Sequence, residues 1–136
     1  MKITQVFFFV VLAGLALSCN AQSSQENEQR SENQVQADQV NVYYFHMTRR
    51  CATCKAVEDV SKQAVKEMDG KNVSFSEYNV EKPEGEEKAK KLGVHGQALL
   101  IVSGDKKINL TREGFMHART NPEKFKEIVQ QKINSL

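Results

Sequence analysis

The sequence predicts a single α/β domain in which helices flank a central mixed sheet, in the order β-α-β-α-β-β-α. Short runs of β-branched, aromatic or continuous apolar residues, typical of buried strands, occupy residues 40–45, 73–80 and 98–102. Apolar residues at helical spacing follow the first run and also close the chain. A turn at residues 103–106 separates two runs, as in a hairpin.

The first two helices are expected between the first three strands. Four apolar residues recur at helical spacing after the first strand: Val57, Val60, Ala64 and Met68. Gly70 is predicted to cap the C-terminus of this helix. Pro83 opens a second helix over residues 84–92, which Gly93 can end.

The C-terminal third is predicted to hold a hairpin and a closing helix. The run at 98–102 is apolar throughout, as expected for a central strand buried on both faces. Ile108 and Leu110 are predicted to continue as its hairpin partner. Asn121 caps the last helix, with Pro122 in its first turn. The buried stripe of this helix is predicted to include Phe125, Ile128, Val129 and Leu136.

The start of the chain has the features of an export signal. Lys2 precedes an apolar stretch at residues 6–17, which is too short to cross a bilayer as a helix. The sequence Ala16-Leu17-Ser18-Cys19 resembles a bacterial lipobox, although alanine stands where such boxes usually have leucine. The resemblance implies cleavage before Cys19 and a lipid on that cysteine. Residues 1–18 are therefore predicted to be a signal peptide.

An ordinary secretory cleavage site is the second interpretation of this region. Small residues at Cys19 and Ala21 would suit it, and the mature chain would then begin at Gln22. Both interpretations predict an exported protein. Asn20 supplies no acidic signal for retention at the inner membrane. In a cell with two membranes, we therefore expect the lipid anchor in the outer membrane, facing the periplasm.

Residues 19–38 are predicted to form a lipidated, flexible tether ahead of a folded domain at residues 39–136. Beyond Cys19 the tether consists mainly of Gln, Asn, Ser and Glu, with almost no large apolar side chain. Such a segment cannot bury enough surface to offset the entropy lost on ordering. Its expected contribution is reach between membrane and domain.

Composition excludes several classes of function. The formal net charge of +2 is too small to argue for nucleic-acid binding, and the lack of tryptophan disfavours a base-stacking platform. Three cysteines are too few for a disulfide-scaffold protein. No flavin or nicotinamide fingerprint is present in the sequence, so we expect no cofactor.

The sequence Cys51-Ala52-Thr53-Cys54 is the main candidate for chemistry. Cysteines three apart in the first turn of a helix lie on one face, which suits a disulfide. Cys51 should sit at the amino end of the helix, where free N–H groups and the helix dipole favour a thiolate. Arg49 and Arg50 add positive charge, another cause of low thiol pKa values. Cys51 is therefore predicted to be the nucleophile and Cys54 the resolving thiol.

Two other interpretations of this pair stay open. A static disulfide is possible in an oxidising compartment. A copper or zinc site is the other, in which His46 or His95 completes a ligand set with Cys51 and Cys54. Structural zinc normally needs a second ligand pair, and the sequence has no second CxxC.

Two segments carry a family resemblance. The sequence KLGVHGQALLIV at residues 91–102 resembles the second half of thioredoxins, which implies a thioredoxin-like fold. More narrowly, YYFH at residues 43–46 with RRCATCK at 49–55 resembles the family of nitrophenyl compound nitroreductase subunit ArsF. That resemblance implies an electron-transfer accessory role.

The sequence departs from the thioredoxin pattern at two places. Ala98 stands where thioredoxins have a cis-proline facing the cysteines, and His95 lies in the same loop. A cis bond before a residue other than proline costs about 3–4 kcal/mol, so the bond between Gln97 and Ala98 is predicted to be trans. Thioredoxins also carry a buried aspartate in the first strand, where this chain has only apolar and aromatic residues from Val42 to Phe45.

The leading prediction of function is an envelope thiol–disulfide oxidoreductase or electron-relay lipoprotein. Its expected partner is a dedicated protein with a thiol or disulfide, and the chain itself is expected to be a monomer. The alternatives are copper or zinc binding and delivery, and a non-catalytic interaction module of the same fold.

Overall fold

The computed structural model describes residues 39–68 and 70–136. Its four strands form one sheet in the order β2-β1-β3-β4. β1 pairs in parallel with β2 and antiparallel with β3, and β3 pairs antiparallel with β4. In chain order the elements are β1 (Val40–His46), α2 (Ala52–Lys66), β2 (Val73–Asn79), α3 (Pro83–Leu92), β3 (Ala98–Ser103), β4 (Lys106–Asn109), α4 (Thr111–His117) and α5 (Pro122–Asn134).

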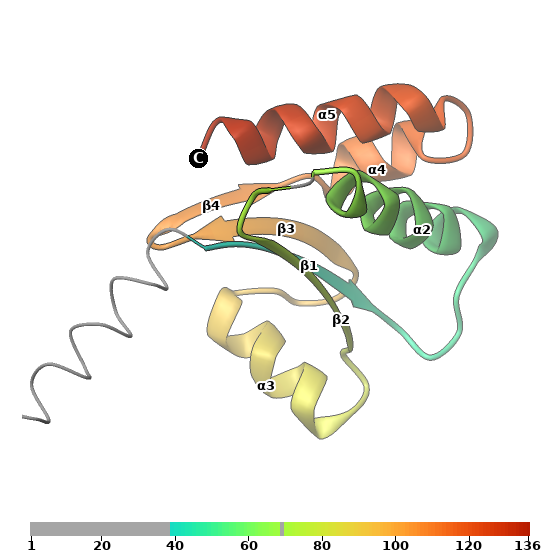
Figure 1. Cartoon of the computed structure of the whole chain (residues 1–136). Coiled ribbons are helices and arrows are strands. Elements are labelled where there is room, and N and C mark those ends of the chain that lie inside the picture. Colours follow the sequence, from blue (N-terminus) through green and yellow to red (C-terminus); the bar gives the residue numbers. More distant parts are fainter. Residues whose placement is uncertain (1–38, 69) are drawn as a thin grey trace, which may run out of the picture.

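The helices cover both faces of the sheet. Figure 1 shows α2, α4 and α5 on one face and α3 on the other. The larger core lies under α2 and α5 and includes Tyr44, Val57, Leu99 and Phe125, all with no exposed surface. The smaller core lies under α3 and contains Phe45. β1 therefore contributes its alternate residues to two different cores, as expected for a central strand.

The structure adds one helix to the predicted order. Residues 111–117 form α4 between the hairpin and α5, and Leu110 is the N-cap of this helix and not a strand residue. The sequence gives little sign of α4, because this helix is only seven residues long and has a glycine at its centre. A Cβ on Gly114 would lie 3.1 Å from atoms of Phe125 and of Val57. Glycine is needed here because α4 packs closely against α2 and α5.

The predicted helix ends are confirmed at two positions and wrong at one. Gly93 caps α3 with φ +69°, and the Asn121 side chain accepts a hydrogen bond from the Lys124 N–H. Gly70 does not cap α2, which ends at Lys66 with Glu67 as its C-cap. The Met68 N–H bonds to the Val65 carbonyl, so the chain has left the helix before it reaches the glycine.

The predictions for the N-terminal segment lie outside the described residues. They concern the signal peptide at 1–18, the tether at 19–38 and lipidation of Cys19. Among the described residues, no helix combines the length and apolar character that crossing a membrane requires.

Gly85→Ala is expected to destabilise the fold. A Cβ on Gly85 would overlap the backbone carbonyl of Asn79, because α3 lies directly against the end of β2 at this glycine. We expect the free energy of unfolding to fall by about 1–3 kcal/mol, the usual cost of overpacking, measured by chemical denaturation. Gly96→Ala is the matched control because a Cβ there meets nothing within 4 Å. Equal stability of the two variants would contradict the close approach.

Candidate functional site

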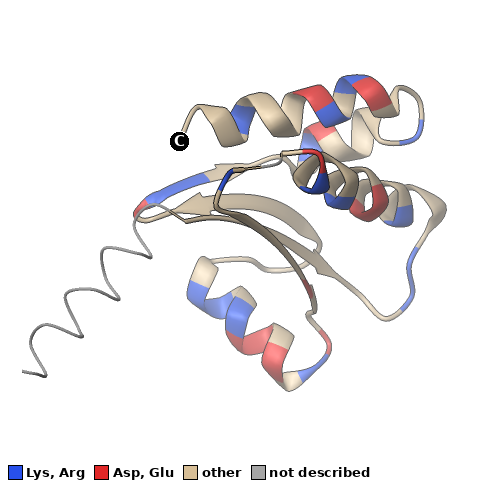
Figure 2. Ribbon diagram, viewed as in Figure 1, with Lys and Arg blue, Asp and Glu red and all other residues tan. Residues whose placement is uncertain are grey.

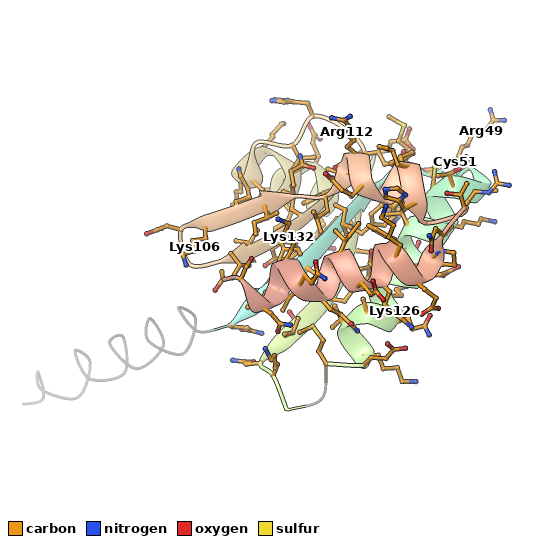
Figure 3. All side chains as sticks on the ribbon, turned by 90° about the horizontal axis from the view of Figure 1, so that it is seen from above. Arg49, Cys51, Lys106, Arg112, Lys126 and Lys132 are labelled. Atoms are coloured by element: carbon orange, nitrogen blue, oxygen red, sulfur yellow. A yellow bond between two sulfur atoms is a disulfide. The ribbon has the colours of Figure 1, made fainter. Side chains whose placement is uncertain are left out.

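Cys51 lies at the amino end of α2 and caps this helix. Its backbone is extended, with φ −78° and ψ 168°, and its Sγ accepts a hydrogen bond from the Cys54 N–H at 3.1 Å. Sulfur therefore takes the place that serine or aspartate oxygen usually occupies at an N-cap. Cys51 is exposed, and Figure 3 shows it at the rim of the molecule beside Arg49. An acceptor sulfur at this position is favoured further when it carries negative charge.

Cys51 and Cys54 form a disulfide, with 5.1 Å between their Cα atoms. This separation lies within the normal range for a disulfide. The two sulfurs differ in access, because Cys54 is only 5% exposed. A second thiol can reach Cys51 from solvent, whereas Cys54 is shielded by the fold.

The surroundings of Cys51 are basic. Arg49 and Arg50 precede it, Lys55 follows it, and the first turn of α2 contains no acidic residue. Figure 2 shows this basic segment in the loop between β1 and α2. Arg49 projects into solvent (Figure 3). Positive charge at a helix N-terminus stabilises a thiolate relative to the neutral thiol.

Two successive hydrogen bonds connect the side chains of Gln97 and Tyr44 to the backbone of Cys54. The Tyr44 hydroxyl donates to the Cys54 carbonyl at 2.9 Å, and the Gln97 side-chain amide donates to the Tyr44 oxygen at 2.8 Å. Burial raises the pKa of Tyr44, so the hydroxyl stays protonated and remains a donor. β1, the loop before β3 and the first turn of α2 are thereby joined at the site.

A second network ties the loop before Cys51 to α2 and β2. Arg50 forms an ion pair with Glu58, a residue only 7% exposed. Lys62 bonds to Glu58 at 2.6 Å and to Glu77 of β2 at 2.8 Å. Hydrogen bonds with the Glu58 carboxyl and with Lys62 lower the pKa of Glu77 to about 2. Two cations and two carboxyl groups thus alternate along one connected path.

Hydrogen bonds at Thr48 also fix the start of the loop between β1 and α2. The Thr48 N–H donates to the Glu81 carboxylate at 2.8 Å, and the Asn79 amide donates to the Thr48 hydroxyl at 3.0 Å. Hydrogen bonds from the Thr48 side chain and backbone lower the pKa of Glu81. The segment leading into Cys51 is therefore anchored to the end of β2.

The predicted histidines occupy different environments. His46 is 5% exposed, and its Nδ1 lies 3.0 Å from the Met47 carbonyl oxygen. His95 is exposed and lines a cavity of about 470 Å³ together with Ala98. The cysteines do not line this cavity. The predicted placement of His95 against the cysteine pair therefore has no contact to support it.

The predicted metal-ligand set is not assembled. Within residues 39–68 and 70–136, no three His, Cys, Asp or Glu side chains gather closely enough to hold a metal ion. The set of Cys51, Cys54, His46 and His95 thus remains a sequence pattern. Ala98 begins β3, is buried, and follows a trans peptide bond, as predicted.

Sequence reasoning missed three residues that contact the site: Tyr44, Glu58 and Gln97. Glu58 of α2 is a buried acid near the cysteine pair, whereas the thioredoxin pattern has its buried aspartate in the first strand. A partial signal was present, since Cys54, Glu58 and Lys62 are four apart within α2 and lie on one face of that helix, whereas Arg50 lies in the loop before it. Tyr44 and Gln97 carry no such local signal, because their contacts depend on strand pairing.

Comparisons with known proteins support the fold. No family model and no curated protein matches the chain. Fasciola hepatica thioredoxin is 18% identical with a TM-score of 0.50, over 78% of this chain and 92% of that one. Thioredoxin Deadhead from Drosophila melanogaster is 18% identical with a TM-score of 0.49, over 78% and 92%. Mitochondrial thioredoxin 3 from Saccharomyces cerevisiae, in oxidized form, is 18% identical with a TM-score of 0.48, over 80% and 90%.

The chain has a thioredoxin-like fold with a disulfide at the junction of β1 and α2. This confirms the predicted fold class. The narrower resemblance to the ArsF family has no support from the comparisons.

Tyr44→Phe is expected to lower stability without changing the path of the chain. The substitution removes the bond to the Cys54 carbonyl and leaves the Gln97 amide without its acceptor. We expect a loss of about 1–2 kcal/mol in the free energy of unfolding, measured by chemical denaturation of the oxidised protein. Tyr78→Phe is the control, since the Tyr78 hydroxyl has no hydrogen bond with the described residues. A Tyr44→Phe variant as stable as Tyr78→Phe would contradict the proposed support.

Proposed function

We propose that this protein is a thiol–disulfide oxidoreductase or electron-relay protein that acts on a protein partner. The observation that carries the proposal is the exposed Cys51 sulfur at the N-cap of α2, paired with a buried Cys54. The Cys51 sulfur can attack a partner disulfide when reduced and can be attacked by a partner thiolate when oxidised. Cys54 is placed to complete the exchange. A disulfide with only a structural role would not need this asymmetry.

The proposed exchange follows from the two positions. In the reduced protein, the Cys51 thiolate attacks one sulfur of the partner disulfide, forming a mixed disulfide and releasing one partner thiolate. Cys54 then loses its proton and attacks the Cys51 sulfur, which re-forms the Cys51–Cys54 disulfide and releases the second partner thiolate. Two electrons and two protons have then passed to the partner. The reverse sequence oxidises a partner dithiol.

A dedicated partner is favoured over general reductase activity. Ala98, after a trans bond, occupies the position where thioredoxins present a cis-proline to their substrates. The loop before β3 therefore lacks the cis-proline, and the Gln97 side chain is hydrogen-bonded to Tyr44. A partner must therefore fit this loop, which supports an electron-relay role.

The Cys51–Cys54 pair is expected to have a measurable midpoint potential against glutathione or dithiothreitol. Reduction should also expose a thiol at Cys51 that titrates below the ordinary value of about 8.5. Cys54→Ser should accumulate mixed disulfides on Cys51, seen by mass spectrometry, because the resolving thiol is missing. Cys51→Ser is the matched control and should trap far less, since Cys54 is shielded. A pair that stays oxidised under strong reductant would instead indicate a static disulfide in an interaction module.

We also propose that the protein is exported and held at the cell envelope by a lipid on Cys19. The support is the lipobox-like sequence that ends at Cys19 and the polar segment that follows it. In a cell with two membranes, the proposed site is the outer membrane, with the domain in the periplasm.

Mass spectrometry of the mature N-terminus tests the anchor. We expect the chain to begin at Cys19 with a diacylglycerol-type modification, and Cys19→Ser to release the protein from the membrane fraction. Ser24→Ala, which lies after the lipobox-like sequence, is the control and should stay in the membrane fraction. An unmodified mature terminus at Gln22 would overturn the lipid anchor and leave plain secretion.

A further inference from the structure

The site contains a buried acidic residue, Glu58, close to the cysteine pair. Glu58 lies one helical turn after Cys54, is 7% exposed, and forms an ion pair with Arg50, the residue directly before Cys51. A buried carboxylate that lacked a partner would cost several kcal/mol. Lys62 already supplies one cation to it at 2.6 Å. The additional ion pair therefore compensates the charge of Arg50, which would otherwise stabilise a thiolate at Cys51.

The charges around Glu58 come from every side. Arg50 reaches it from the loop, Lys62 from the next turn of α2, and Glu77 through Lys62 from β2. Tyr44 of β1 feels both ends of the ion pair, because the charge of Glu58 raises its pKa and that of Arg50 lowers it, beyond the larger effects of burial and Gln97. The same Tyr44 hydroxyl donates to the Cys54 carbonyl. The ion pair thus lies within electrostatic reach of the cysteine segment.

We propose that Glu58 is a positioning residue that limits how strongly Arg50 stabilises the Cys51 thiolate. Arg50 and Lys62 both form ion pairs with Glu58, so the Arg50 charge beside Cys51 is compensated at Glu58. Arg49 and Lys55 remain as the cations without an ion pair among the described residues near the cysteine. Removal of the Glu58 charge leaves Arg50 uncompensated and favours the thiolate. Reduced protein then gains stability relative to the disulfide.

This inference rests on the proposed reactivity of Cys51, but its test does not need a partner. In a Cys54→Ser background, Cys51 is the single thiol of the site, and its alkylation rate by iodoacetamide reports the thiolate fraction. The full chain is used, and peptide-resolved mass spectrometry separates Cys51 from Cys19. If the wild-type pair resists reduction, the proposed function fails while this measurement still stands.

Glu58→Gln is expected to raise the alkylation rate of Cys51 at pH 6 by three- to tenfold. Arg50→Gln is expected to lower it, because the cation itself is lost. Glu67→Gln, the same charge change near the other end of α2, should leave the rate unchanged, since Glu67 is exposed and pairs with Lys126. With Cys54 restored, the same factor in the glutathione equilibrium corresponds to a rise in midpoint potential of about 14–30 mV.

The double variant tests whether Glu58 acts through Arg50. In the Arg50→Gln background, Glu58→Gln should have a much smaller effect, and the two changes should be non-additive. Full additivity, or an unchanged or lower rate in Glu58→Gln alone, would overturn the proposal. If Glu58→Gln does not fold, Glu58→Asp retains the buried charge but withdraws it from Arg50. A smaller increase in rate is then expected, and no increase overturns the proposal.

Discussion

The central position of β1 is the constraint on which the rest of the structure depends. β1 pairs with β2 on one side and β3 on the other, and helices bury both of its faces. A strand so enclosed must be apolar, and it must deliver its last residues to one fixed edge of the sheet. The loop to Cys51 begins at that edge. The place of the disulfide is therefore set by the packing of the sheet.

The chemistry of the site comes from the end of a helix rather than from a pocket. The Cys51 sulfur caps the N-terminus of α2, and the Cys54 carbonyl accepts a hydrogen bond from the Tyr44 hydroxyl. The described cavity near His95 lies beside this arrangement and does not include the cysteines. The proposed exchange with another protein suits such a site, because the exposed Cys51 is accessible to a second chain.

Local pattern was sufficient for much of the fold. The first three strands, α3 with Gly93, and the Asn121 cap were all predicted, since each depends on periodicity or on a capping residue within a few positions. The hidden helix α4 and the early end of α2 were not predicted. Gly114 weakens the helical signal, and its role emerges only when Phe125 and Val57 are seen against it.

The sequence by itself determined the fold class and the cysteine pair, because strand runs and spacing within one helix are local properties. Only the tertiary structure decided what surrounds that pair. Glu58 of α2 pairs with Arg50 of the preceding loop, and Gln97 of the loop before β3 bonds to Tyr44 of β1. Both contacts join segments whose distance is set by chain closure and side-chain burial, which no periodicity along the chain records. For the same reason, the sequence showed that the first strand lacks a buried acid but did not show that Glu58 of α2 is one.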